Sequence, residues 1–111
     1  MTRMIMAVFS DAVSADHEDE YNDWYSNIHV HDVCAIPGVQ SARRFKASTV
    51  ESAFSGEVAG GNRYLVLYEI QTDDPQEVEN EMRKRLADGR LRPTDTLKLD
   101  PAPVALYYDE I

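Results

Sequence analysis

Two short runs of the sequence, residues 3–10 and 63–71, carry apolar side chains on both faces of the strands that they predict. In the second run, Tyr68 points to one face while Leu65 and Leu67 point to the other, because side chains alternate along a strand. A face in contact with water would alternate to polar residues. Helices can cover one face of such a sheet, so the other face predicts sheet-to-sheet contact with a second copy of the chain.

A helix is expected after the first strand. Ser14 or Asp16 can cap its start, and the acidic residues that follow favour the positive end of the helix dipole. The helix should run to about Ile36, because Pro37 cannot continue the hydrogen-bond ladder and Gly38 can adopt positive φ.

The rest of the chain predicts two further strands and a second helix. Residues 39–47 alternate as a strand does, and 48–62 form a small, polar connection longer than a tight hairpin. Asp74-Pro75 begins a helix that ends at Gly89, residues 90–103 form an irregular excursion, and 104–108 supply the last strand. The order is β-α-β-β-α-β in a single domain, residues 1–111. It predicts the ferredoxin-like α+β fold, a four-stranded antiparallel sheet with both helices on one face.

Charge and composition exclude several classes of partner. The chain has 20 acidic residues against 11 Lys and Arg, a net charge of −9, which disfavours nucleic acid and anionic membranes. A single cysteine, Cys34, cannot form an internal disulfide, so no oxidising compartment is required. No apolar stretch is long enough to cross a bilayer, and the first ten residues lack a signal cleavage site. We expect a cytoplasmic protein.

The first predicted helix carries the candidate chemistry. At about 100° per residue, its inward stripe consists of Tyr21, Trp24, Tyr25, Ile28, His29, Asp32, Ala35 and Ile36, with Val33 at the margin. Asp32 falls near the centre of this stripe, three residues after His29. A buried carboxylate requires a compensating donor, a raised pKa or a polar cavity. A cavity between helix and sheet is the functional interpretation.

In that interpretation His29 is the general acid or base, because an imidazole exchanges protons near neutral pH. Asp32 orients the imidazole, and Tyr25 donates a phenolic hydrogen bond. Trp24 and Tyr21 form an aromatic wall for the substrate.

Structural roles remain open for the same residues. His29 and Asp32 could satisfy each other, or Asp32 could pair with Arg43 on the second strand. Arg43, if it faces inward, could hold a carboxylate or stabilise an enolate, or form a structural ion pair instead. The hydroxyls of Tyr64 and Tyr68 could line a pocket, or their rings could fill the sheet.

Metal and cofactor sites lack support in the sequence. His31 points away from His29 on a regular helix, and His29 with Asp32 leaves a zinc ion short of its third protein ligand. There is no phosphate-binding glycine loop, nucleophile elbow or dinucleotide fingerprint. We therefore expect neither a metal nor a cofactor.

Several segments resemble one known family, the EthD-like branch of the dimeric α+β barrel superfamily. Its members show a similar N-x-W-Y-x-x-x-H-x-x-D-V segment, then I-P-G and an arginine-phenylalanine strand. The matching segments here are 21–33, Ile36-Pro37-Gly38-Val39, 41–45, 64–70 and 107–111. Trp24, Tyr25, His29, Asp32 and Arg43 occupy the recurring positions, whereas His31 stands where such sequences often carry proline, and the 48–62 loop is also a departure.

The resemblance implies a homodimer whose sheets face each other, with a ligand cavity in each subunit between sheet and helices. Members include cofactor-free monooxygenases, polyketide cyclases, lactone isomerases and lyase-like proteins, so the fold does not choose the reaction. Our hypothesis is a cofactor-independent lyase, isomerase or cyclase acting on a small apolar aromatic or polyketide-like molecule. The alternatives are a cofactor-free monooxygenase of phenolic substrates and a noncatalytic binding or accessory protein.

Overall fold

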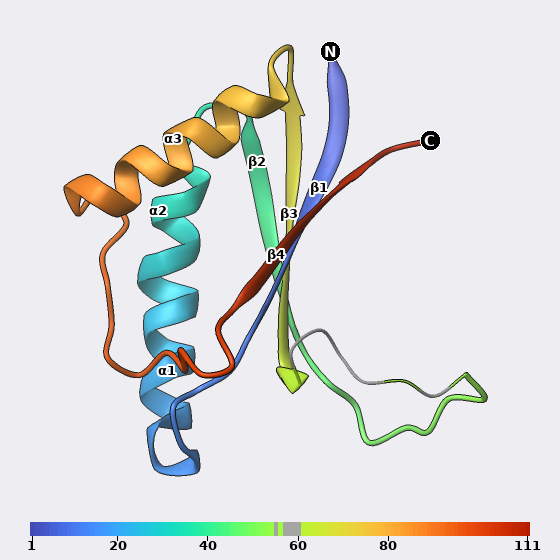
Figure 1. Ribbon diagram of the computed structural model, residues 1–111, viewed down its shortest axis with the longest axis vertical. Helices are drawn as coiled ribbons and strands as arrows, with labels where there is room; N and C mark the ends of the chain where they lie inside the picture. Colours follow the sequence, from blue (N-terminus) through green and yellow to red (C-terminus); the bar gives the residue numbers. More distant parts are fainter. Residues whose placement is uncertain (55, 57–60) are drawn as a thin grey trace.

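Four antiparallel strands form one sheet, and the helices lie on one side of it (Figure 1). The computed structural model describes residues 1–54, 56 and 61–111. The strands are β1 (Thr2–Ser10), β2 (Val39–Lys46), β3 (Tyr64–Thr72) and β4 (Val104–Asp109), in the spatial order β2-β3-β1-β4. This arrangement confirms the predicted ferredoxin-like α+β fold. The predicted 48–62 connection lies partly outside the described residues.

The central pair of strands sets the two faces of the sheet. β1 and β3 pair with Met6 opposite Tyr68 and Ala7 opposite Leu67. Met6 and Tyr68 point to the helices and are buried, so Ala7 and Leu67 point to the opposite, open face. The core between sheet and helices contains Met4, Met6, Tyr21, Trp24, Tyr25, Val33, Ile36, Val39, Tyr64, Val66, Tyr68, Ile70, Val78 and Leu91.

The first helix contains a π-helical turn that the sequence pattern did not predict. A short 3-10 turn, η1 (Ala15–His17), leads into α1 (Glu18–Trp24), the π turn η2 (Tyr25–His29) and α2 (Val30–Cys34). A π turn adds one residue and rotates the face of the helix that follows it. Beyond this turn the predicted inward stripe was wrong at Ala35, which is exposed, and at Asp32, which lies at the edge of the layer. Ile36 is buried as predicted, and Val33, expected only at the margin, is buried as well.

A β-bulge in β2 likewise shifts its alternation. The pairing with β3 is irregular between Val39 and Ser41, so Val39 faces the helices but Arg43 does not. Arg44 lies opposite Val66 and takes the helix-facing position instead. The expectation that Arg43 faces inward was wrong, because it assumed unbroken alternation from Val39.

The second helix, α3 (Pro75–Asp88), begins and ends where its capping residues predict. The side chain of Asp74 accepts a hydrogen bond from the backbone N–H of Glu77 at 3.3 Å. Gly89 ends the helix with φ of +83°. Residues 90–103 then return toward the first helix without regular structure, apart from an isolated bridge between Ala12 and Leu97.

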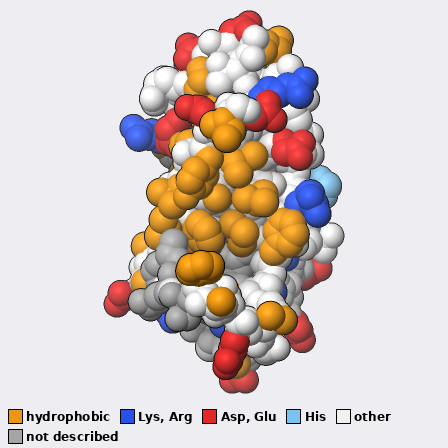
Figure 2. All heavy atoms as spheres, turned by 90° about the vertical axis from the view of Figure 1, so that its right-hand side faces the viewer, with side chains coloured by type: hydrophobic (Ala, Val, Ile, Leu, Met, Phe, Trp, Pro, Cys, Tyr) orange, Lys and Arg blue, Asp and Glu red, His pale blue; other side chains and the backbone are white. Residues whose placement is uncertain are grey.

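The open face of the sheet presents a continuous apolar patch (Figure 2). The register places on this face Ile5, Ala7, Phe9, Phe45, Leu65, Leu67, Leu106 and Tyr108. None of the described helices covers this patch, because they all lie on the other side of the sheet (Figure 1). Among the described helices, none has the length and hydrophobicity that a bilayer crossing requires.

Candidate functional site

His29 lies at the end of the π turn, against two aromatic rings. Its imidazole stacks on Trp24, with ring centroids 4.6 Å apart, and meets Tyr25 edge-on at 4.9 Å. The Nδ1 atom is buried and has no hydrogen-bond partner among the described residues. Burial lowers the pKa of His29 to about 4, with the positive charge of Arg44 adding to this and Asp32 opposing it. His29 is therefore neutral at physiological pH.

Asp32 does not form the expected pair with His29. Its carboxylate accepts hydrogen bonds from the Arg92 guanidinium, at 2.8 Å from Nη2 and 3.0 Å from Nε, and from the Arg92 backbone N–H at 3.0 Å. These hydrogen bonds lower the pKa of Asp32. Both arrangements expected from the sequence, with His29 or with Arg43, are replaced by this one.

Arg92 is a site residue that sequence reasoning missed. It lies in the irregular excursion, 60 residues from Asp32, and no spacing in the sequence relates the two. Its carbonyl oxygen also accepts a hydrogen bond from Trp24 Nε1 at 3.2 Å. Arg92 therefore ties the excursion to both sides of His29 on the first helix.

Three tyrosines fill the layer between the first helix and the sheet. The Tyr21 hydroxyl shares a 2.6 Å hydrogen bond with Ser10 Oγ. Burial raises the pKa of Tyr25 to about 12 and also raises the pKa of Tyr68. The buried Tyr68 hydroxyl forms no hydrogen bond with the residues that the structure describes. These phenols remain protonated at neutral pH and can act as donors.

Arg44 is the cation of this layer. Its guanidinium lies over the Tyr25 ring, 4.6 Å from the centroid, and donates to Ser26 Oγ at 2.8 Å and Asn22 Oδ1 at 2.9 Å. Its Nε atom is buried, and no described residue accepts a hydrogen bond from it. Arg43, the arginine that the sequence singled out, lies on the open face, with its guanidinium 5.2 Å from the Phe45 ring centroid. The geometry thus gives Arg44 the position expected for Arg43.

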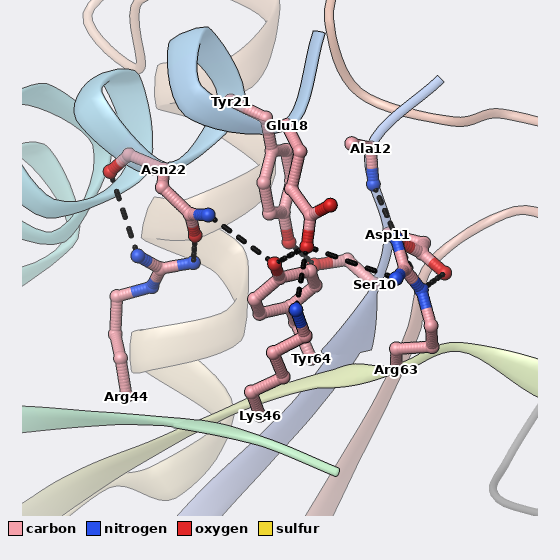
Figure 3. A network of polar contacts seen from close by, with 10 residues as sticks. All are labelled: Ser10, Asp11, Ala12, Glu18, Tyr21, Asn22, Arg44, Lys46, Arg63 and Tyr64. Atoms are coloured by element: carbon pink, nitrogen blue, oxygen red, sulfur yellow. Dashed lines mark hydrogen bonds and ion pairs between the residues drawn. The ribbon is translucent and has the colours of Figure 1, made fainter. Parts of the chain in front are cut away.

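Tyr64 belongs to a separate polar network at the start of the first helix (Figure 3). Its hydroxyl donates to Glu18, which also accepts from Lys46 Nζ at 2.8 Å. Hydrogen bonds from Lys46 and Tyr64 lower the pKa of Glu18 to about 2. Arg63 completes the network by holding Asp11 with Nη2 at 2.9 Å. Because its polar groups already have partners, this network holds the helix start against β2 and β3.

Two surface grooves lie elsewhere on the molecule. One, of about 790 Å³, runs over one end of the open face and is lined by Arg3, Ile5, Glu69 and Tyr108, among others. The other, of about 440 Å³, lies between α3 and β4 beside Tyr107. His29 lines neither groove. Among the described residues, no three His, Cys, Asp or Glu side chains gather closely enough to hold a metal ion.

Solved structures share this fold at low sequence identity. An EthD (ethyl tert-butyl ether D) family protein from Bacillus halodurans is 15% identical, with a TM-score of 0.58 and full coverage of both chains. A protein provisionally assigned as a monooxygenase, from Shewanella loihica, is 18% identical, with a TM-score of 0.59, covering 100% of this chain and 97% of its own. A dimeric ferredoxin-like protein of unknown function from Thermobifida fusca is 11% identical, with a TM-score of 0.56, covering 98% and 92%.

These likenesses define the class of fold. The chain has the ferredoxin-like α+β fold that EthD-like and dimeric ferredoxin-like proteins share, as its sequence resemblance predicts. No protein-family model matches the sequence, and no curated protein matches it either.

Proposed function

We propose that the protein is a cofactor-independent enzyme that moves a proton on a small apolar, aromatic or polyketide-like molecule, as a lyase, isomerase or cyclase does. His29 is the proton acceptor. The observation that carries the proposal is the buried Nδ1 of His29 beside Trp24 and Tyr25, for which the described part of the chain offers no hydrogen-bond partner. Buried polar atoms rarely lack partners, and π turns occur frequently at functional sites.

The charges around His29 suit the formation of an anion from the substrate. A pKa of about 4 makes the imidazole a weak base in the free protein. An enolate or phenolate formed next to it would raise that pKa, because the anion stabilises the imidazolium. Arg44 and the protonated hydroxyl of Tyr25 or Tyr68 are the groups proposed to stabilise the negative oxygen.

Asp32 has a different role in this proposal from the one that the sequence indicates. Its hydrogen bonds go to Arg92, so it acts on His29 only through its charge, which favours the protonated imidazole. Trp24 and Tyr21 supply the apolar wall against which an aromatic substrate would pack.

The test compares His29→Gln with His31→Gln, which changes an exposed histidine on the same helix. Turnover is screened on phenols, enolisable ketones and lactones, and the histidine signals are titrated by NMR with and without each compound. We expect His29→Gln to lose at least about 100-fold in turnover and His31→Gln to retain it. Full activity of a folded His29→Gln protein would exclude His29 as the acid or base, and binding without product would indicate a noncatalytic protein.

A cofactor-free monooxygenase is the second candidate. It is favoured by the fold shared with the provisionally assigned monooxygenase from Shewanella loihica. In that reaction His29 would remove the proton of a phenol, and the resulting anion would react with oxygen. Oxygen consumption that matches product formation would select this candidate, and turnover without oxygen would reject it.

The proposal includes a homodimer that buries the open face of the sheet. The apolar patch of Figure 2 is the supporting observation, because soluble monomers rarely expose a continuous patch across a whole sheet. The structural neighbour from Thermobifida fusca is itself described as dimeric. Sedimentation at micromolar concentration tests this part, and a monomer would contradict it.

A further inference from the structure

The open face carries charges of both signs within its apolar surface, with Arg43 and Glu69 among the strands and Arg3 at the end of β1. Arg43 on β2 lies opposite Leu67, and Glu69 on β3 lies opposite Ile5. Leu67 and Ile5 both belong to the apolar patch, so Arg43 and Glu69 share its face. Glu69 also lines the groove of about 790 Å³ at one end of this face.

Neither Arg43 nor Glu69 is paired with an opposite charge among the described residues. The Arg43 guanidinium lies over the Phe45 ring, 5.2 Å from its centroid, and forms no ion pair with any described residue. Glu69 has neither an ion pair nor a side-chain hydrogen bond in the part of the chain that the structure describes. A second copy seated on this face would take both charges out of water, and leaving them unpaired there would be strongly unfavourable.

Two-fold symmetry offers each charge a partner of opposite sign. In an isologous interface, a contact from residue i to residue j is matched by a contact from j to i. From this geometry we infer that Arg43 of each subunit pairs with the partner's Glu69, so that two equivalent ion pairs fix the register of the homodimer. The inference rests on the homodimer proposed above.

The role of these pairs is selectivity. The remaining patch is aliphatic and aromatic, and apolar contacts alone do not distinguish one sheet register from another. A guanidinium and a carboxylate form directional, often paired hydrogen bonds, and a wrong register places like charges together or leaves a charge buried. The arrangement therefore admits a second copy of this chain and excludes other apolar sheet faces.

A charge-swap experiment tests the inference. The variants are Arg43→Glu, Glu69→Arg, the double variant, and Lys84→Glu on the exposed side of α3 as a control with the same change in net charge as Arg43→Glu. Sedimentation equilibrium measures dimer dissociation, and circular dichroism confirms that each variant is folded. We expect each swap alone to weaken the dimer about 10-fold or more and the double variant to restore it. Lys84→Glu should dimerise as the wild type does.

Mixing the two single variants gives the sharpest result. Arg43→Glu makes positions 43 and 69 both acidic and Glu69→Arg makes them both basic, so the mixture should form heterodimers more tightly than either variant forms homodimers. A wild-type monomer would overturn the proposed homodimer and this inference with it. A wild-type dimer that single swaps leave unchanged, or that the double variant fails to restore, would overturn the ion pairs alone.

Discussion

His29 shows how one residue's surroundings decide its chemistry. An exposed imidazole has a pKa near 6.5, but the rings of Trp24 and Tyr25 exclude water from this one and lower its pKa to about 4. The unfolded chain restores the ordinary value. Between pH 6.5 and 4 the unfolded state therefore binds more protons than the folded state, and the free energy of unfolding must fall as the pH falls.

Replacing His29 should flatten this pH dependence. The wild type should lose roughly 3 kcal/mol from this group as the pH falls from 6.5 to 4, whereas His29→Gln should not. Urea unfolding at several pH values measures the difference, with His31→Gln as the control. The burial of a neutral imidazole would be refuted if His29→Gln and the wild type lost stability equally over this range.

At the scale of elements, the π turn in the first helix and the bulge in β2 change which side chains face the site. The sequence correctly predicts a helix through Tyr25 and His29 and a strand through Arg43 and Arg44. It does not predict the π turn or the bulge, because periodicity arguments assume a constant rotation per residue. Each irregularity changes one predicted site residue. Asp32 lies at the edge of the helix face and not at its centre, and Arg44 takes the helix-facing position predicted for Arg43.

Arg44 should hold the π turn against the sheet. It donates to Asn22 before the turn and to Ser26 within it, so Arg44→Lys removes the paired hydrogen bonds but keeps the charge. We expect a loss of about 1–2 kcal/mol in stability and faster amide exchange across Tyr25–His29. Arg43→Lys, on the opposite face, is the matched control. Unchanged exchange in Arg44→Lys would show that packing alone maintains the turn.

The cap of α3 gives a second test at this scale. Asp74→Ala removes the side-chain oxygen that accepts the Glu77 N–H and should cost about 1 kcal/mol. Asp73→Ala, one residue earlier and exposed, should have little effect. Thermal unfolding compares the two variants. Equal losses of stability in the two variants would mean that acidic charge near the helix start stabilises α3 and that the hydrogen bond of the cap does not.

For the whole molecule, the two faces of the sheet differ in how far they are buried. The helices bury one face, whereas in a single chain Leu106 on the open face remains 40% exposed. The proposed homodimer would bury this side chain and the apolar patch around it, which gives the interface its hydrophobic driving force.

An acidic substitution on the open face should separate assembly from folding. Leu106→Asp places a charge on the apolar patch and should weaken the dimer at least about 10-fold without unfolding the chain. Leu86→Asp, on the exposed side of α3, changes a side chain that is 60% exposed and should leave the dimer unchanged. Sedimentation and circular dichroism report the two properties. An unaffected dimer in Leu106→Asp would place the interface elsewhere.

The sequence alone determined the element order, the ferredoxin-like fold and the apolar character of both sheet faces. These properties follow from local signals: alternation along strands, caps at helix ends and turn residues between them. Only the tertiary structure decided that Asp32 binds Arg92, that Arg44 lies beside Tyr25, and that the half-buried His29 is neutral. Those contacts join segments far apart in the chain, and a shift of one residue in a helix or strand changes which side chains meet, so no local pattern encodes them.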